Sequence, residues 1–440
     1  MVRIVPIEDR GLGNTSYLVD LGDGSGLVVD PERDPRPYLE AAKQEGLVVR
    51  HVAETHLHAD FVSGAREFVA LGASLIAPRG SHLAHPHRAV GEGDHLQLGD
   101  LTLRVLDTPG HTPEHVAYLL HEGEAPLVLF SGGTLMAGGV ARPDLISPDL
   151  TLTLAHQAYQ SVRRLLDNLP DEIELRPTHG GGSFCSSAGA SESGGSTVGS
   201  EKRAHPAMTA PDAESFVSDL LAGLGSYPPY FRRLREVNRE GPKTFGIDLP
   251  RLAQIGADDL AGRTVVDVRP IETFANGHIA GAVSIALRDE FGTWLGWLFD
   301  PDTPLVFMLS PDQDERNLVS QALNIGYENL AGRIDVDHWV KAGNELATID
   351  LISADQIATG TPILDVRQTS EWELGHVPSA THIELGDLRA SLARVKPESV
   401  VHCGHGQRAM TAASILAKTG TPVAVNTAGQ AEIARAVGGR

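Results

Sequence analysis

A repeated segment in the second half of the chain constrains the fold most strongly. Residues 264–269 (Thr-Val-Val-Asp-Val-Arg) have a near copy in residues 362–367 (Pro-Ile-Leu-Asp-Val-Arg), and in both copies a Gly-His pair begins ten residues after the aspartate. An internal repeat with a period of about one hundred residues indicates two tandem modules. Strand and helix patterns alternate within each copy, and Asp-Val-Arg closes an apolar run. The pattern therefore predicts two three-layer α/β modules with parallel sheets.

The second copy contains the segment that best predicts chemistry. An apolar run ends at Cys403, two glycines then allow a tight turn, and an amphipathic helical pattern follows up to Lys418. A thiol at a strand end, ringed by backbone N–H groups at the start of a helix, has a lowered pKa and an anion site beside it. We expect its sulfur to face a solvent-accessible pocket. The candidate catalytic residues are Cys403 and Arg408, and the candidate anion loop is Gly404, His405, Gly406 and Gln407.

The first copy lacks this loop. Its corresponding stretch, residues 305–311 (Leu-Val-Phe-Met-Leu-Ser-Pro), has no thiol, no glycine-rich turn and a proline where N–H donors are needed. We place Ser310 at the position that matches Cys403. The first module is therefore expected to be catalytically inactive, with a role in packing or docking.

The N-terminal part of the chain has three loops that carry histidine. In the first, two histidines and an aspartate at positions i, i+2 and i+4 follow a predicted strand over residues 48–53. Two further loops, each after a predicted strand, contribute one histidine apiece. Neutral imidazole and carboxylate are suitable ligands for zinc or iron. The candidate metal ligands are His56, His58, Asp60, His111 and His179.

These segments resemble known families. The loop from Cys403 to Arg408, with the Gly-His segments before it, resembles the active site of rhodanese sulfurtransferases, which carry sulfane sulfur as a cysteine persulfide. Residues 55–60 (Thr-His-Leu-His-Ala-Asp) resemble the first signature of the metallo-β-lactamase superfamily. Residues 110–115 and 132–145 are similar to its persulfide dioxygenase branch, which includes fusions to a pseudo-rhodanese and a rhodanese.

The resemblance covers essentially the whole chain and implies its architecture. The expected fold is α/β: an αββα metallo-β-lactamase sandwich followed by two rhodanese-like three-layer α/β modules. We place the lactamase-like domain at residues 1–246, the rhodanese-like domain without a catalytic cysteine at 247–348, and the rhodanese domain with Cys403 at 349–440.

One departure from the family affects the metal site. Where the family has Thr-Gly-Asp-Thr-Leu-Phe, this chain has Ser-Gly-Gly-Thr-Leu-Met, so that Gly133 replaces an aspartate ligand. In the dioxygenases, the resemblance implies, this aspartate completes an iron site with the residues matching His56 and His111. Phe61 also replaces a family histidine. Further along, Gly139 and Ala141 replace an aspartate and a glycine.

Three states of the metal site stay open without that carboxylate. The first is an iron site completed by Asp60 or water. The second is a three-histidine zinc site made by His56, His58 and His111, with Asp60 and His179 nearby. The third has no metal. The expected cofactor is thus one Fe(II) or zinc ion, or none because of Gly133. If the lost carboxylate disables iron chemistry, Gly133→Asp should raise iron content and oxygen uptake.

The resemblance implies two coupled activities. The N-terminal domain would oxidise a low-molecular-weight thiol persulfide with O₂ to sulfite and thiol, and Cys403 would move sulfane sulfur to or from sulfite, forming or consuming thiosulfate. One alternative is a sulfurtransferase whose metal domain only binds, and another is a metallo-thioesterase or related hydrolase. A cysteine phosphatase is a further alternative, but Cys403 and Arg408 have four residues between them, one fewer than phosphatase loops.

Composition limits the partners and the compartment. The 440 residues leave room for roughly three domains. A net charge of −21 argues against nucleic acid or an anionic membrane as partner. Two cysteines suit a reducing compartment, and the first residues predict a strand rather than a signal peptide, so we expect a cytoplasmic protein. The expected partners are a thiol persulfide and sulfite or thiosulfate, and a homo-oligomer is compatible with the sequence.

Overall fold

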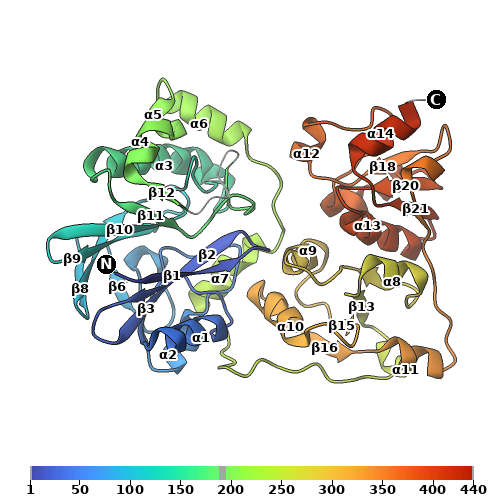
Figure 1. Ribbon diagram of the computed structural model, residues 1–440, viewed down its shortest axis with the longest axis horizontal. Helices are drawn as coiled ribbons and strands as arrows, with labels where there is room; N and C mark the ends of the chain where they lie inside the picture. Colours follow the sequence, from blue (N-terminus) through green and yellow to red (C-terminus); the bar gives the residue numbers. More distant parts are fainter. Residues whose placement is uncertain (1, 188–194, 439–440) are drawn as a thin grey trace. The chain divides into compact units, whose positions relative to one another are not determined.

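The computed structural model describes residues 2–187 and 195–438 (Figure 1). They separate into two compact units. The first comprises the residues up to Pro250 together with Ser320–Gly326, and the second comprises Arg251–Val319 and the residues from Tyr327 onward. Both copies of the sequence repeat lie in the second unit. Among the described residues, no helix is long and apolar enough to cross a membrane.

The first unit is built on two six-stranded sheets. One has the order β1-β2-β3-β4-β5-β6 and the other β12-β11-β10-β9-β8-β7. The strands of the first sheet are β1 Ile4–Asp9, β2 Asn14–Asp20, β3 Ser25–Val29, β4 Val48–Ala53, β5 Ser74–Pro78 and β6 Arg88–Val90. Those of the second are β7 His95–Leu98, β8 Leu101–Asp107, β9 Val116–Glu122, β10 Ala125–Gly132, β11 Glu174–Pro177 and β12 Ser196–Thr197.

The core of this unit lies between the two sheets. In β8, Leu101, Leu103 and Val105 are buried while Thr102 and Arg104 are half-buried, the period of two that a strand with one covered face requires. These residues pack in one apolar cluster with side chains of the first sheet. At about 25 cal/mol for each Å² of apolar surface removed from water, this cluster is a main source of the unit's stability.

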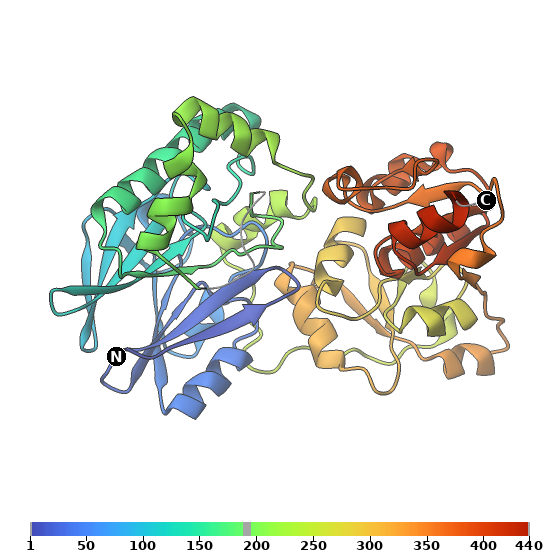
Figure 2. The ribbon, with the colours of Figure 1, turned by 45° about the horizontal axis from the view of Figure 1, so that its top comes forward.

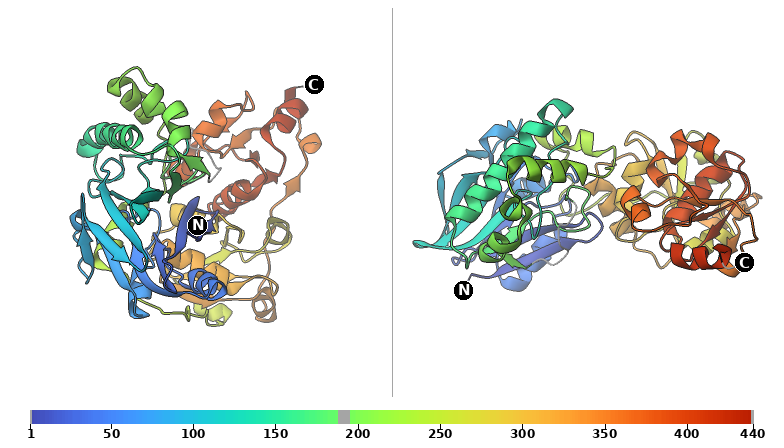
Figure 3. Two further views of the ribbon diagram at one scale, coloured as in Figure 1. Left: turned by 60° about the vertical axis from the view of Figure 1, so that its left-hand side comes forward. Right: turned by 90° about the horizontal axis from the view of Figure 1, so that it is seen from above.

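Helices cover the outer face of each sheet. α1 (Arg36–Glu45) and α2 (Ala65–Ala70) share a cluster with the first sheet, and α3 (Pro148–Asn168) and α6 (Ala213–Ala222) share one with the second (Figures 2 and 3). Ser147 caps α3 by accepting a hydrogen bond from the N–H of Leu150. The remaining helices of this unit are α4 Val198–Ala204, α5 Pro206–Thr209 and α7 Phe231–Glu240. The αββα sandwich implied by the sequence is confirmed.

The second unit holds two parallel sheets, one for each copy of the repeat. The first module has the order β14-β13-β15-β16, and the second has β17-β21-β20-β18-β19. The strands are β13 Thr264–Asp267, β14 Val283–Ser284, β15 Leu305–Met308, β16 Leu330–Arg333, β17 Leu351–Ile352, β18 Ile363–Asp365, β19 Thr381–His382, β20 Ser399–His402 and β21 Val423–Asn426.

Short helices alternate with these strands along the chain, as the sequence pattern predicts. In the first module they are α8 Ile271–Asn276, α9 Phe291–Leu298, α10 Glu315–Asn324 and α11 Val336–Lys341. In the second they are α12 Thr369–Glu373, α13 Gln407–Lys418 and α14 Gln430–Gly438. Parallel strands are joined by crossover connections, so the carboxyl ends of all strands lie at the same edge of the sheet. The loops that follow the strands therefore gather at that edge.

Candidate functional site

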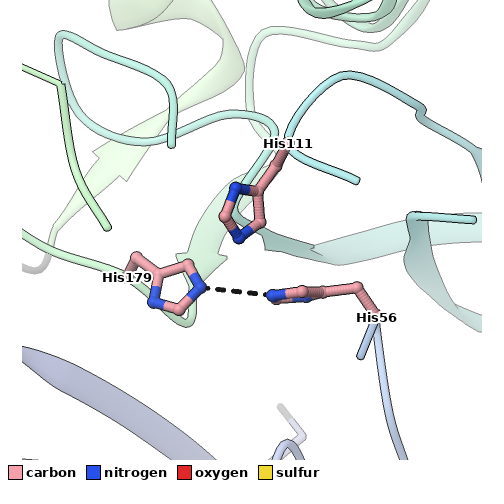
Figure 4. Close-up of side chains that lie close together, drawn as sticks. All are labelled: His56, His111 and His179. Carbon is pink, nitrogen blue, oxygen red and sulfur yellow. Dashed lines mark hydrogen bonds between the residues drawn. The ribbon is translucent and has the colours of Figure 1, made fainter. Parts of the chain in front are cut away.

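Three buried histidines meet where strands of the first unit end. His56 follows β4, His111 follows β8 and His179 follows β11, and each ring is at most 1% exposed. The Nε2 atoms of His56 and His179 lie 3.3 Å apart. One nitrogen from each of the three rings falls within 4.8 Å of the others, and the rings face a common point (Figure 4). This spacing suits ligands of one metal ion.

Each ring is fixed by a hydrogen bond on its other nitrogen. Nδ1 of His56 donates to the Thr55 hydroxyl at 2.8 Å. Nδ1 of His111 donates to the Arg142 carbonyl at 2.7 Å, and Nδ1 of His179 donates to the Asn14 amide oxygen at 2.9 Å. The Thr55 hydroxyl donates onward to Asp30, so it can only accept from His56. These bonds assign the proton to Nδ1 and leave the lone pair of Nε2 for a cation, as in metal sites with ordered outer shells.

Burial keeps the three rings neutral. It lowers the pKa of His111 and of His179 to about 3, with further lowering by a neighbouring histidine in each case. Burial also lowers the pKa of His56 well below its ordinary value. The neutral imidazole is the form that binds metal ions. This part of the first unit is therefore ready to bind a cation at neutral pH.

His58 faces two carboxylates. Its Nε2 lies 3.0 Å from Glu54 and 3.3 Å from Asp30, all inside the protein. Burial alone would lower the pKa of His58, but the two carboxylates outweigh it and raise the pKa to about 10. Two further groups that include His58 could also hold a metal ion, one with Asp60 and His179 and one with Asp30 and Glu54. The structure thus brings the expected ligands together, and His58 is the one that faces two carboxylates.

Asp60 lies beside the three rings but is tied to Asn14. Its carboxylate accepts a hydrogen bond of 2.7 Å from the Asn14 amide, which in turn accepts one from His179. Burial, with the nearby Asp60 carboxylate, raises the pKa of the Cys185 thiol well above its ordinary value. Cys185 is therefore a protonated thiol beside Asp60, which its sequence context did not reveal.

Position 133 faces the same rings. A Cβ atom on Gly133 would lie 2.9 Å from Cδ2 of His111, 3.1 Å from Cδ2 of His179 and 2.8 Å from Cβ of Ala141. A side chain here would thus point at the histidine group, but glycine supplies none. The residues present fit one ion held by imidazoles. Glycine at this position supplies no carboxylate, either to complete an iron site with two histidines or to bridge two metal ions.

Cys403 occupies the expected place in the second unit. It follows β20 directly, and α13 starts four residues later. Gly406 has φ 85°, and a Cβ there would lie 2.8 Å from Thr427, so the turn requires glycine. Cys403 itself is only 2% exposed, whereas Gly404 is half-buried and His405 is exposed. Cys403 is therefore buried, whereas the sequence led us to expect a sulfur open to solvent.

Arg408 is held beside Cys403 by a carboxylate. Its two terminal nitrogens each donate to a different oxygen of Glu371, one of them at 2.8 Å, which is the bidentate geometry that fixes a guanidinium. Burial would raise the pKa of Glu371, but the hydrogen bond and charge of Arg408 lower it. Gln407 is half-buried at the first position of α13.

The first module also contributes to this site, which the sequence pattern does not reveal. The guanidinium of Arg408 lies 5.9 Å from the ring centre of Trp294 in α9, and Trp294 stacks on Trp297 at 5.3 Å. Every residue of α9 is buried. The only available signal was the composition of this helix, whose apolar residues occupy all its faces. Such a helix must be covered on every side.

Strand register corrects the counterpart of Cys403 in the first module. Met308 pairs with Asp267 as His402 pairs with Asp365, so the next residues, Leu309 and Cys403, are equivalent. Ser310, the counterpart expected from the sequence, lies one residue further on. The first module thus has a buried leucine at the nucleophile position.

Comparisons with known proteins match three segments of the chain to two families. Residues 9–179 match the metallo-beta-lactamase superfamily, and residues 252–335 and 349–436 each match the rhodanese-like domain. A solved metallo-beta-lactamase from Staphylococcus aureus is 29% identical, covers 76% of this chain and 99% of its own, and has a TM-score of 0.67.

Two curated relatives match part of the chain. The chain is 42% identical over 122 residues to hydroxyacylglutathione hydrolase from Methylobacillus flagellatus, which is 27% of this chain and 46% of that protein. It is 32% identical over 168 residues to the enzyme of the same name from Aliivibrio fischeri, 38% of this chain and 61% of that protein. The match spans about half the length of these relatives. The chain thus joins a domain of the metallo-beta-lactamase superfamily to two rhodanese-like domains.

Proposed function

We propose that the chain is a sulfurtransferase of sulfur metabolism that carries sulfane sulfur on Cys403. The observation that supports this most is the loop itself: a cysteine at the end of β20, a glycine turn, and Arg408 fixed by Glu371 in the second rhodanese-like domain. The first rhodanese-like domain has Leu309 at the same place and so has no nucleophile. The rhodanese-like domains support a role in sulfur chemistry. The identities of the sulfur donor and the sulfur acceptor are part of the proposal.

The proposed reaction has two displacement steps. In the first, the Cys403 thiolate attacks the outer sulfur of thiosulfate, the S–S bond of the donor breaks, and sulfite leaves with the bonding electron pair. In the second, a nucleophilic acceptor attacks the outer sulfur of the Cys403 persulfide and releases the thiolate. Arg408 would offset the negative charge of both the anionic donor and the persulfide. The reverse sequence consumes a thiol persulfide and sulfite and forms thiosulfate.

A cyanide assay for thiocyanate tests the sulfurtransferase. The wild-type chain should form thiocyanate from thiosulfate and cyanide, and intact-protein mass spectrometry should show a gain of one sulfur atom after thiosulfate alone. Cys403→Ser should lose both, because an alkoxide is not available at neutral pH. Leu309→Cys in the Cys403→Ser background is the matched control and should restore neither. Equal activity in wild type and Cys403→Ser would remove the basis of the proposal.

For the first unit we propose metal-dependent chemistry on a sulfur-bearing small molecule. The similarity to hydroxyacylglutathione hydrolases favours a thiol-derived substrate, either a thioester or a low-molecular-weight thiol persulfide. A bound ion would supply Lewis acidity, and Asn14, Thr55 and the Arg142 carbonyl would hold its imidazole ligands in place. An oxygen electrode with glutathione persulfide and a thioester-hydrolysis assay on the same metal-loaded protein separate the two substrates. Activity with neither would leave this unit as a binding module.

A further inference from the structure

We infer that His402 is a positioning residue for anionic sulfur at Cys403: its ring holds the carbonyl of Cys403 and so keeps the N–H groups of the following turn directed at thiosulfate or a persulfide. His402 serves the sulfur transfer proposed for Cys403, so this role rests on that function. It narrows the substrates to sulfur species that carry negative charge.

The turn after Cys403 presents backbone N–H groups that the protein itself does not use. Those of Gly404, His405 and Gly406 make no hydrogen bond to another residue that the structure describes. Free N–H groups in a tight turn that opens a helix are suitable donors to an anion. Their direction depends on the peptide planes of the turn, and the first of these planes joins Cys403 to Gly404.

His402 fixes this first peptide plane. It is the last residue of β20, its side chain is fully buried, and its Nδ1 makes a long hydrogen bond of 3.4 Å to the carbonyl of Cys403. A carbonyl can only accept, so Nδ1 is the donor. Because the peptide is planar and trans, the N–H of Gly404 points to the opposite side. The ring thus holds the carbonyl and leaves the N–H available to an anion.

The other nitrogen of the ring faces a carboxylate that already has its donors. Nε2 of His402 lies 3.4 Å from Asp365. Asp365 accepts from the backbone N–H of Arg367 at 3.0 Å, from its Nε at 3.0 Å and from its Nη2 at 2.7 Å. Burial lowers the pKa of His402, although the Asp365 carboxylate opposes this. A neutral ring has one proton, and the carbonyl of Cys403 is the neighbour with the greater need of it.

The first module has the same aspartate and arginine but lacks the ring. Met308 takes the position of His402, since it pairs with Asp267 as His402 pairs with Asp365. Met308 is fully buried, so this position in the sheet accepts a side chain that cannot donate a hydrogen bond. Packing of the sheet therefore does not require histidine here. The ring is present in the module that has the cysteine, as a role in the turn predicts.

Variants that keep or remove one ring nitrogen at a time test this role. His402→Met copies the first module and should lower kcat/KM for thiosulfate by about tenfold, the effect of one hydrogen bond, mainly through KM. His402→Asn places an amide donor near Nδ1 and should recover most of this loss, whereas His402→Gln places one near Nε2 and should not.

Met308→His is the matched control, because it adds a ring where no cysteine follows, and it should show wild-type kinetics. Thermal unfolding of each variant separates a loss of folding from a loss of positioning, and the Asn and Gln variants decide the matter if His402→Met does not fold. Wild-type kinetics in His402→Met, or recovery by Gln rather than Asn, would overturn the role of His402.

Protection of Cys403 by sulfate separates this role from the proposed function. Sulfate resembles thiosulfate in charge and size but has no sulfur to transfer. In the wild type it should slow the alkylation of Cys403 by iodoacetamide, followed by mass spectrometry, with sodium chloride of equal ionic strength as the control. The sulfate concentration for half protection should rise by about tenfold in His402→Met. Protection without sulfur transfer in the wild type would remove the proposed function but support anion recognition by the turn. Equal protection in both proteins, or none in the wild type, would overturn the role of His402.

Discussion

The two rhodanese-like modules share individual hydrogen bonds and differ at the end of one strand. In the first, Arg269 donates to Asp267 at 2.6 Å and to the Gly277 carbonyl at 2.8 Å. In the second, Arg367 donates to Asp365 at 2.7 Å and to the Gly375 carbonyl at 2.8 Å. The scaffold that carries the loop is therefore present in both.

The turn after this strand is built differently in the two modules. After β15, the N–H of Ser310 donates to the side chain of Gln313, whose amide donates to the carbonyl of Val268. A side chain thus holds the turn after β15, whereas Gly406 with a positive φ shapes the turn after β20. The two modules therefore differ in this turn, and the shared scaffold serves a second purpose.

That second purpose is contact with the module that carries Cys403. The N–H of Ser284 donates to the hydroxyl of Ser414 in α13 at 3.1 Å, and Arg389 donates to the carbonyl of Leu298 at 2.6 Å. A Cβ on Gly386 would lie 1.9 Å from the indole nitrogen of Trp297, so only glycine fits there. The first module therefore packs against the second through residues on both sides of the Cys403 loop in sequence.

The largest expected effect comes from the shared ion pair. Asp267→Asn and Asp365→Asn should each destabilise the second unit by about 3–5 kcal/mol, because each leaves a buried arginine without its carboxylate. Guanidinium unfolding followed by circular dichroism measures this. The two modules should respond alike, since each aspartate accepts the same bonds from its arginine. A large loss in one variant and none in the other would break the equivalence of the two scaffolds.

Arg408→Ala should reduce thiosulfate:cyanide activity by about 100-fold, because it removes a fixed positive charge beside the thiolate and the anionic donor. Arg316→Ala is the matched control, since Arg316 is the second residue of α10 as Arg408 is of α13, and it is exposed. Steady-state kinetics on both variants make the comparison. A loss in Arg316→Ala of similar size would mean that the first module takes part in catalysis.

The sequence was sufficient where the information is local. The αββα sandwich and the two rhodanese-like modules followed from motifs that lie at strand ends, and both are confirmed. The position of Cys403 after a strand and before a helix also followed from residues within one short segment. Apolar periodicity and turn glycines determine such features, because each depends on neighbours in the chain.

The features that the sequence did not predict depend on contacts between distant segments. The buried pair of His58 with Asp30 was not predicted, because Asp30 is far from His58 in sequence. Leu309 rather than Ser310 matches Cys403 because strand pairing sets the register, and a shift of one residue reverses every side chain. The closed space at Gly133 needed the position of Ala141.

Trp294→Ala should lower kcat/KM of sulfur transfer by about fivefold, since a cation–π contact is worth about 1 kcal/mol. Trp294 would act as a positioning residue through Arg408, so the loss should appear in KM for anionic thiosulfate, and Trp294→Phe should restore most of it. A change in stability alone, with kinetics as in the wild type, would limit the first module to packing.

The smallest expected effect concerns Glu371, whose counterpart in the first module, six residues after the aspartate, is Thr273. The pKa of Glu371 is below its ordinary value of 4.5, because Arg408 outweighs burial. Its charged form thus stabilises the folded state above that ordinary value, and this contribution is lost as pH falls through the lowered pKa. Glu371→Gln should therefore cost up to about 1 kcal/mol at neutral pH, a value limited by the partly exposed carboxylate, and the difference from the wild type should shrink in acid. Thermal midpoints of both proteins across acidic and neutral pH measure it, with Thr273→Val as the control that should show no such dependence. A difference that grows as the pH falls would mean that Glu371 is protonated in the folded protein and does not hold Arg408 by charge.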